Sequence, residues 1–229
     1  MNLSLRIYYR MKSEMQSGEI YLKSLIGQGE NQHLDFKFEI SDAKKIARTF
    51  SAFANTGGGK LLIGVKDNGR ISGIRTDEEI YMADSAARMY SRPEVGFHIK
   101  KWHVEGRAIL EIDIPPSEKR PHYARNDAGE WTAYVRVGDQ NMQANRILVN
   151  YWKGEGNSRA VMLNYGREEK ILMSYLAEFD KITLSKFMRI ARTGRSEAEN
   201  ILVDMMLLKV IDMEITERAV FYRLNPIQS

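Results

Sequence analysis

Two acids and a lysine lie close together in the segment GQGENQHLDFKFE, residues 27–39. Glu30 and Asp35 are five positions apart, and Lys37 follows Asp35 by two positions. Since side chains two apart along a strand point to the same face, Asp35 and Lys37 should lie side by side. These residue types could handle a phosphate group, with the lysine holding an oxygen. They could equally form the solvated polar face of an edge strand.

The elements around this segment follow from hydrophobic periodicity. Residues 33–40 alternate between apolar and polar, which predicts a half-buried strand with Phe38 on its apolar face. A helix is expected over residues 43–55, because Ser41 or Asp42 can cap its first turn and glycines follow its end. The apolar run 60–65 predicts a strand covered on both faces, and Gly69 would turn the chain into a hairpin partner over 70–74.

The following part of the chain continues to mix helices and strands. A helix is expected over 77–91, two strands over 97–104 and 108–114 around a turn at Glu105–Gly106, another strand over 133–138, and a helix over 145–152. The sequence therefore predicts a mixed α/β (α+β) domain over residues 1–153, with an N-terminal helical extension.

A change of composition predicts a second domain. Glycine, serine and asparagine mark a linker, which we place at residues 154–165. Three short amphipathic helices (168–179, 183–192 and 196–209) and a hairpin (210–215 and 219–224) are expected after it. Ser196 and Glu199 have the spacing of a capping box for the third helix. This order is the layout of a winged helix-turn-helix domain, residues 166–229.

Three spaced motifs carry a family resemblance. The segments ENQHLDFK, SAFANTGGGKLLIGVKDNGRISGI and AYVRVG occur in this order and resemble the Schlafen AlbA_2 domain family over roughly residues 25–140. The resemblance implies a mixed α/β fold, association with nucleic acid and, in bacterial members, a C-terminal winged helix. For some members it implies a metal-dependent endoribonuclease that uses three acids.

The three acids of the family fall on Glu30, Asp35 and Asp67, with Lys37 beside them. The second is Asp35 where the family usually has Glu, which withdraws the carboxylate by about one methylene. A nuclease would use these acids to hold Mg²⁺ or Mn²⁺, because both ions prefer oxygen ligands, and the ion would activate water. Asp35 and Asp67 could converge if their strands are neighbours.

The segment NTGGGK does not have the form of an ATP-binding P-loop. Leu61 follows Lys60 where Ser or Thr is required, Ala54 stands where the first glycine should be, and the order is helix and then strand. No cofactor is therefore expected apart from the metal ion of the nuclease alternative. The glycines at 57–59 instead predict a tight helix-to-strand connection.

Basic and aromatic residues alternate in two other segments of the first domain, where they could follow a phosphate backbone and stack on bases or simply be solvated. The candidates for nucleic-acid contact are Lys100, Lys101, Arg120, Tyr123, Arg125 and Arg136, the last being the arginine of the family motif. In the winged helix the candidates are Arg189, Arg192, Arg195 and Asn200. The acids of the third helix oppose DNA contact there, so dimerisation or protein docking is the alternative.

Composition limits the function classes. The chain has no cysteine, which excludes disulfides and thiolate metal sites, and no apolar run long enough for a membrane span. The first sixteen residues lack the features of a secretory signal, so a cytoplasmic location without membrane association is expected. The net charge is +4, and residues 166–229 hold ten basic and ten acidic residues, so the whole surplus lies in residues 1–165.

These observations favour a nucleic-acid-binding protein, specifically a DNA-binding transcriptional regulator, with DNA or structured RNA as partner and homo-oligomer formation left open. The first alternative is the metal-dependent endoribonuclease acting through Glu30, Asp35 and Asp67 on structured RNA. The second alternative is a protein-interaction module.

Overall fold

The computed structural model describes residues 17–156 and 165–225 and divides the chain into two compact units. Unit 1 ends at Gln143 and unit 2 begins at Ala144. Helix α4 (Arg146–Gly156) belongs to unit 2, where the Arg146 Nε lies 3.6 Å from the Glu199 Oε2. The domain boundary expected after residue 153 therefore falls inside this helix. Among the helices of the described residues, none combines the length and the hydropathy that a membrane-spanning segment requires.

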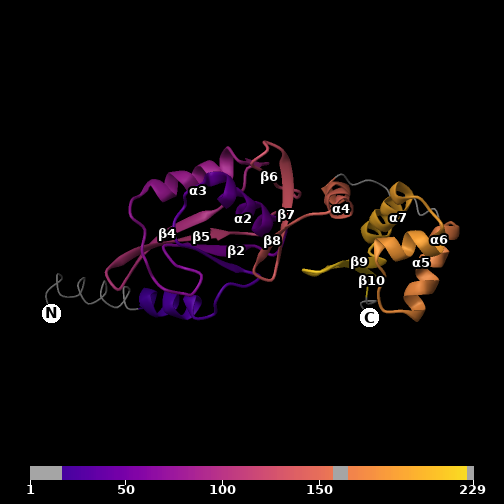
Figure 1. Cartoon of the computed structure of the whole chain (residues 1–229), viewed down its shortest axis with the longest axis horizontal. Helices are drawn as coiled ribbons and strands as arrows, with labels where there is room; N and C mark the ends of the chain where they lie inside the picture. The colour runs from indigo at the N-terminus through magenta and orange to yellow at the C-terminus, as the bar shows by residue number, and fades with distance from the viewer. Residues whose placement is uncertain (1–16, 157–164, 226–229) are drawn as a thin grey trace, which may run out of the picture. The chain divides into compact units, whose positions relative to one another are not determined.

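Unit 1 contains two four-stranded sheets, visible on either side of α2 in Figure 1. The first has the order β1-β2-β5-β4 and consists of β1 (Leu34–Lys37), β2 (Gly59–Ile63), β4 (His98–Val104) and β5 (Arg107–Ile114). The second has the order β3-β6-β7-β8 and consists of β3 (Ser91–Arg92), β6 (Tyr123–Arg125), β7 (Trp131–Val137) and β8 (Gln140–Gln143). Only β1 and β2 pair in parallel, and all other pairs are antiparallel.

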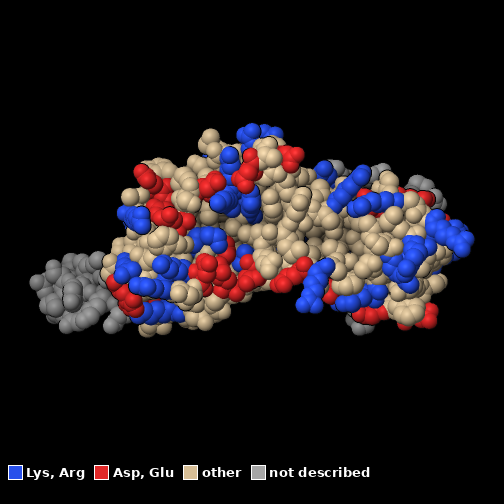
Figure 2. All heavy atoms as spheres, in the orientation of Figure 1, with Lys and Arg blue, Asp and Glu red and all other residues tan. Residues whose placement is uncertain are grey.

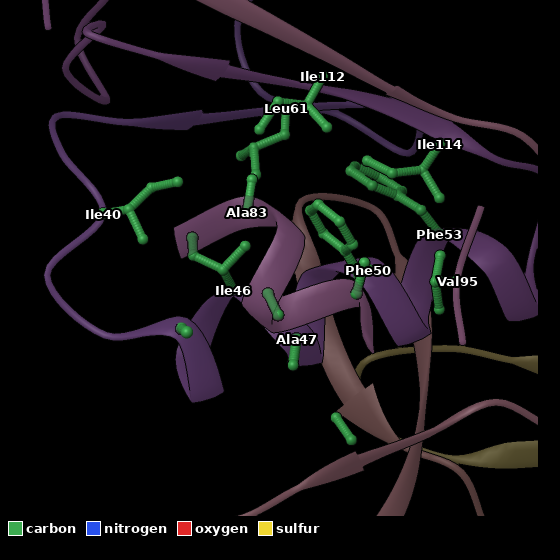
Figure 3. Packing of buried hydrophobic residues seen from close by; sticks show 14 of the residues in the cluster. Ile40, Ile46, Ala47, Phe50, Phe53, Leu61, Ala83, Val95, Ile112 and Ile114 are labelled. Atoms are coloured by element: carbon green, nitrogen blue, oxygen red, sulfur yellow. The ribbon is translucent and has the colours of Figure 1, made fainter. Parts of the chain in front are cut away.

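Helix α2 (Ala43–Asn55) is the centre of unit 1 because both sheets pack on it. It begins where Asp42 accepts a hydrogen bond from the Lys44 N at 2.8 Å, which confirms one of the two expected caps. Phe50 and Phe53 are fully buried and face Ile112 and Ile114 of β5, as Figure 3 shows. Helix α3 (Glu78–Arg88) closes the same core.

The other side of α2 is attached to the second sheet by buried polar groups. The Asn55 amide donates to the carbonyls of His122 and Tyr134 at 2.8 and 2.9 Å, and its oxygen accepts from the His122 N at 2.7 Å. The Ser51 hydroxyl donates to the same His122 carbonyl at 2.8 Å. Buried backbone groups need such partners, and here the helix supplies them in place of a neighbouring strand.

The opposite face of the first sheet is covered by the helix at residues 17–26. Burying Glu111 at the centre of this face requires several partners. Its carboxylate accepts hydrogen bonds from Lys60, Tyr21 and Trp102 at 2.6, 2.8 and 2.7 Å. Burial alone would raise the pKa of Glu111, but these three donors outweigh it and leave the pKa below its ordinary value.

Unit 2 has helices α4, α5 (Arg167–Glu178), α6 (Leu184–Ala191) and α7 (Arg195–Leu207), followed by the antiparallel pair β9 (Ile211–Ile215) and β10 (Val220–Leu224). The three helices and hairpin after residue 165 are consistent with a winged helix. The predicted capping box at Ser196 is wrong, because α7 begins after Gly194 and the Glu199 side chain is buried against Arg195.

Two other expectations differ from the structure. The hairpin partner predicted over 70–74 is reduced to one bridge between Val65 and Ile71, because β2 pairs with β1 and β5 instead. The strand predicted over 33–40 ends at Lys37, whose carbonyl accepts from the Gly64 N and the Val65 N at 2.9 and 3.3 Å. Phe38 is consequently 38% exposed instead of buried.

Candidate functional site

Asp35 is a buried carboxylate at the edge of the first sheet. Its residue exposure is 2%, so the expectation of a solvated polar face is wrong at this position. The Lys37 Nζ lies 3.1 Å from the Asp35 Oδ2, as the two-residue spacing predicts. The Thr49 hydroxyl of α2 donates to the same oxygen at 3.4 Å. The polar face of β1 is thus covered by α2, which the alternating pattern could not show.

The third partner of this carboxylate is Arg136 of β7, whose Nη2 lies 3.4 Å from the Asp35 Oδ1. Arg136 also donates to the carbonyls of Asn31 and Leu34 and to the side-chain oxygen of Asn141 at 3.1–3.2 Å. The Asn141 amide in turn donates to the Thr49 hydroxyl at 2.9 Å. Arg136 therefore connects the second sheet with β1, and its side chain, 1% exposed, is occupied by protein groups and not presented to a phosphate.

Glu30 completes this group, which we call the acid cluster: Glu30, Asp35, Lys37, Thr49 and Arg136. The Glu30 Oε1 accepts from the Phe36 N at 2.9 Å and lies 3.8 Å from the Lys37 Nζ. Burial and a side-chain hydrogen bond with Asp35 raise the pKa of Glu30 from its ordinary 4.5 to about 7. Near neutral pH a substantial part of the Glu30 carboxyl therefore keeps its proton, and only this protonated form can donate to Asp35.

Asp67, the third acid expected in a nuclease site, forms no three-ligand group with Glu30 and Asp35 among the described residues. It is exposed in the turn after β2, four positions beyond the end of that strand. Within residues 17–156 and 165–225, no group of three or more His, Cys, Asp or Glu side chains is placed to hold a metal ion. Glu30 and Asp35 are brought together, and Lys37 and Arg136 are the cations that lie beside them.

The carboxylates of the acid cluster are paired with cations of the protein itself. Two carboxylates face one lysine and one arginine, and Asp35 receives donors from three different elements. A buried pair of this kind stabilises a fixed arrangement, because removing one partner leaves a charge without compensation. With Lys37 and Arg136 bound to Asp35, this carboxylate is not an open ligand for Mg²⁺ or Mn²⁺.

Apart from Arg136, which belongs to the acid cluster, the nucleic-acid candidates of unit 1 lie on β4, on β6 and in the loop before β6. On β4, Lys100 and Lys101 are exposed; Lys100 lies over the Trp102 ring, with its Nζ 3.7 Å from the ring centroid, and Lys101 pairs with Asp77 at 2.6 Å. Arg120 and Tyr123 are half-buried and Arg125 is exposed. The structure thus does not gather these residues with the acid cluster into one site.

The candidates of unit 2 are exposed around the turn between α6 and α7 (Figure 2 shows Lys and Arg atoms gathered over α6). Arg192 takes a left-handed conformation there with φ of 54°, and Arg195 donates to the buried Glu199 at 2.8 Å. Glu199 therefore does not present its charge to a ligand. Asn200 is exposed and lines a cavity of about 420 Å³ between α4 and α7, together with Lys153 and Asp204.

Several residues that matter were missed by the sequence prediction. Thr49 and Asn141 complete the acid cluster, but neither stands in a pattern that could have indicated this. Cations also lie against part-exposed rings at two unpredicted places: Lys66 and Arg75 against Phe38, and Arg92 against Trp131. The only available signal was the basic surplus of the N-terminal part.

A comparison with family models matches most of unit 1. The model of the family described as Schlafen, AlbA_2 matches residues 30–145. Two solved structures are similar: the DIP2311 protein of Corynebacterium diphtheriae, with 20% identity and a TM-score of 0.44, and the N-terminal domain of a Nitrosomonas europaea protein described as related to the ATP-dependent DNA helicase RecG, with 23% identity and a TM-score of 0.41.

The coverage of these matches is partial. The DIP2311 comparison covers 63% of this chain and 29% of that one, so the chain spans less than a third of DIP2311. The RecG-related comparison covers 55% of this chain and 92% of the other. A comparison with curated proteins gave no match.

Proposed function

The chain belongs to the Schlafen AlbA_2 family, and from this premise we propose that it binds nucleic acid without cleaving it, as a DNA-binding transcriptional regulator. The observation that carries the proposal is the placement of cations against aromatic rings on unit 1. Lys66, Lys100 and Arg92 each lie within about 6 Å of a ring centroid. Such pairs attract phosphates, and the rings of Phe38 and Trp131, which are 38% and 36% exposed, add faces on which bases can stack.

The acid cluster supports binding over hydrolysis. A metal-dependent nuclease needs carboxylates that are free to coordinate an ion, and Asp35 is instead surrounded by Lys37, Arg136 and Thr49. The cluster is better suited to hold β1, α2 and the second sheet in one arrangement. Unit 2 would contribute DNA contacts as a winged helix through Arg189 and Arg192, which are exposed beside α7.

The proposal is tested by fluorescence anisotropy with labelled duplex DNA, single-stranded DNA and structured RNA. We expect binding at 50 mM salt that weakens steeply by 200 mM, because phosphate contacts release counterions. If none of the three probes binds at 50 mM salt, the proposal is refuted. The remaining hypothesis would then be that the protein is a protein-interaction module.

The same samples distinguish the nuclease alternative. Each RNA is incubated with Mg²⁺ or Mn²⁺, and the products are separated by gel electrophoresis. We expect intact RNA. Metal-dependent cleavage that Asp67→Ala abolishes without unfolding the protein would establish the endoribonuclease instead.

A further inference from the structure

Phe38 is an exposed aromatic ring whose position the local pattern does not explain. Leu34 and Phe36 of the same strand are 2% and 0% exposed, whereas Phe38 is 38% exposed. The strand ends at Lys37, whose carbonyl accepts hydrogen bonds from the Gly64 N and the Val65 N, directly after β2. The ring therefore stands at the edge of the sheet, where water reaches its surface.

Two cations from distant segments lie against this ring. The Lys66 Nζ is 5.3 Å from the ring centroid and the Arg75 guanidinium carbon is 5.9 Å from it. Lys66 follows β2, and Arg75 precedes α3. In the part of the chain that the structure describes, neither side chain forms an ion pair, so both positive charges remain available beside the ring.

A hollow with basic residues borders the same turn. The Gly69 N donates to the Lys66 carbonyl at 2.7 Å and the Lys66 N to the Arg70 carbonyl at 3.0 Å, which places Lys66 and Arg70 next to each other. Gly69 has φ of 79°, which favours glycine. Beside Arg70 is a hollow of about 550 Å³ that also borders Lys23, Glu105 and Arg107.

The charge of this hollow is positive after its internal pairs are counted. Lys23 lies 2.9 Å from Glu105 and 2.8 Å from Glu19, so these three groups together carry one negative charge. Arg107 instead donates to the carbonyls of Ile71 and Ser72 at 2.9 and 3.3 Å, which fix the guanidinium without removing its charge. Arg70 adds a second positive charge, so the two arginines exceed the negative charge at Lys23 by one. Figure 2 shows Lys and Arg atoms gathered, with acids among them, over the end of unit 1 that carries the helix at residues 17–26.

A flat ring beside two cations, next to a hollow with two further cations, matches the chemistry of one ligand class. Single-stranded nucleic acid presents unpaired bases that can stack on an aromatic ring and a phosphate for every base. A duplex offers the phosphates, but its bases are stacked on each other inside the helix. We infer that Phe38 with Lys66 and Arg75, together with the hollow at Arg70 and Arg107, forms a binding site for single-stranded nucleic acid. This inference rests on the proposed function and names the form of nucleic acid that unit 1 takes.

The stacking step is tested with Phe38→Leu, which keeps an apolar side chain and removes the ring. Affinity for a labelled 12-nucleotide single strand should fall at least about fivefold, since one stacked base contributes roughly that much or more. Affinity for a 12-base-pair duplex should change by less than about twofold, and Phe38→Tyr should restore single-strand binding. Tyr81→Leu removes a 74% exposed ring from α3 and is the matched control.

The phosphate step is tested with Arg70→Gln. Each lost phosphate contact should make the plot of log affinity against log salt shallower by about 0.7 for a single strand. Arg88→Gln removes the same charge from α3, where Arg88 already pairs with Asp84, and should leave the slope unchanged. Melting temperatures of all variants confirm that the fold is retained.

The outcomes separate the inference from the proposed function. If the wild-type protein binds none of the probes, the proposed function itself fails. If it binds but Phe38→Leu has the affinity of the wild type, or loses duplex and single strand equally, the stacking site is refuted alone. A mononucleotide that binds as tightly as the 12-nucleotide strand would also overturn the inference, because it would assign the site to a free nucleotide.

Discussion

Replacing Glu30 by glutamine should make the protein more stable at alkaline pH and leave its stability unchanged at acidic pH. Glutamine has the shape of the protonated carboxyl, so it can accept from the Phe36 N and donate to Asp35 as protonated Glu30 does. At pH 8 the wild-type protein holds two ionised carboxylates at this place, and the variant holds one. The variant therefore removes a repulsion that exists only when Glu30 is ionised.

The magnitude follows from the shift of the Glu30 pKa from 4.5 to about 7. One pKa unit corresponds to about 1.4 kcal/mol, so the whole shift corresponds to about 3 kcal/mol. Since the Glu30 side chain is 21% exposed, water reduces this to about 2 kcal/mol. Between pH 4.5 and 7 the folded wild-type protein retains a proton that the unfolded chain has released, so its free energy of unfolding falls as pH rises through this window.

The assay is urea denaturation of both proteins at pH 5, 6, 7 and 8 at constant ionic strength. The difference in the free energy of unfolding, variant minus wild type, should rise from a few tenths of a kcal/mol at pH 5 to about 2 kcal/mol at pH 8. Glu39→Gln removes an exposed carboxylate outside the acid cluster and is the control. A variant that is less stable than the wild type at pH 8 would refute the reasoning, because it would mean that ionised Glu30 is held favourably by Lys37.

Three further substitutions test the scaffold of unit 1. Arg136→Met should destabilise the protein by about 3–5 kcal/mol in urea denaturation, because Asp35 stays buried without its arginine; a loss below about 1 kcal/mol would contradict this account. Glu111→Gln should lose about 1–3 kcal/mol at pH 7, and the loss should shrink as the pH falls below the ordinary value of 4.5, since the wild-type pKa is lowered; a loss independent of pH would contradict the lowered pKa. Phe50→Ala should cost about 3–5 kcal/mol, and Tyr81→Ala, at an exposed site, should stay within about 0.5 kcal/mol of the wild type; equal losses would mean that Phe50 is not in the core.

The elements of unit 1 were predictable where a pattern lies within one segment. The helix at 43–55 and its Asp42 cap were expected and are present, because a helical period and a capping residue are local signals. The second sheet was missed apart from β7, since β3 and β8 have two and four residues and obtain their partners only from the tertiary fold. The polar residues Ser51 and Asn55 attach α2 to that sheet. The helical pattern does not show whether polar residues at these positions face solvent or the core.

Of the contacts in the acid cluster, only the one between Asp35 and Lys37 could be predicted from the sequence. Residues two apart on a strand must share a face, and Lys37 does contact Asp35. The partners of that pair come from positions 14 and 101 residues away, namely Thr49 and Arg136. Sequence spacing carries no information on such contacts. The same limit explains why Asp67 could be aligned with a family motif and still lie in an exposed turn.

The distribution of the family motifs over the structure separates what identifies this chain from what it does. Asp35, Asn55 and Arg136 belong to three motif segments, and all three are buried and bonded to protein groups of other elements. Their side chains fix β1, α2 and β7 relative to one another, so a match to the motifs is evidence for the fold. The residues that can meet a ligand, such as Phe38, Arg70 and Arg107, lie beside these positions on turns and strand ends, where function is often carried. Variation at those exposed positions, with the buried motif residues kept, would therefore change the nucleic acid that is bound without changing the fold.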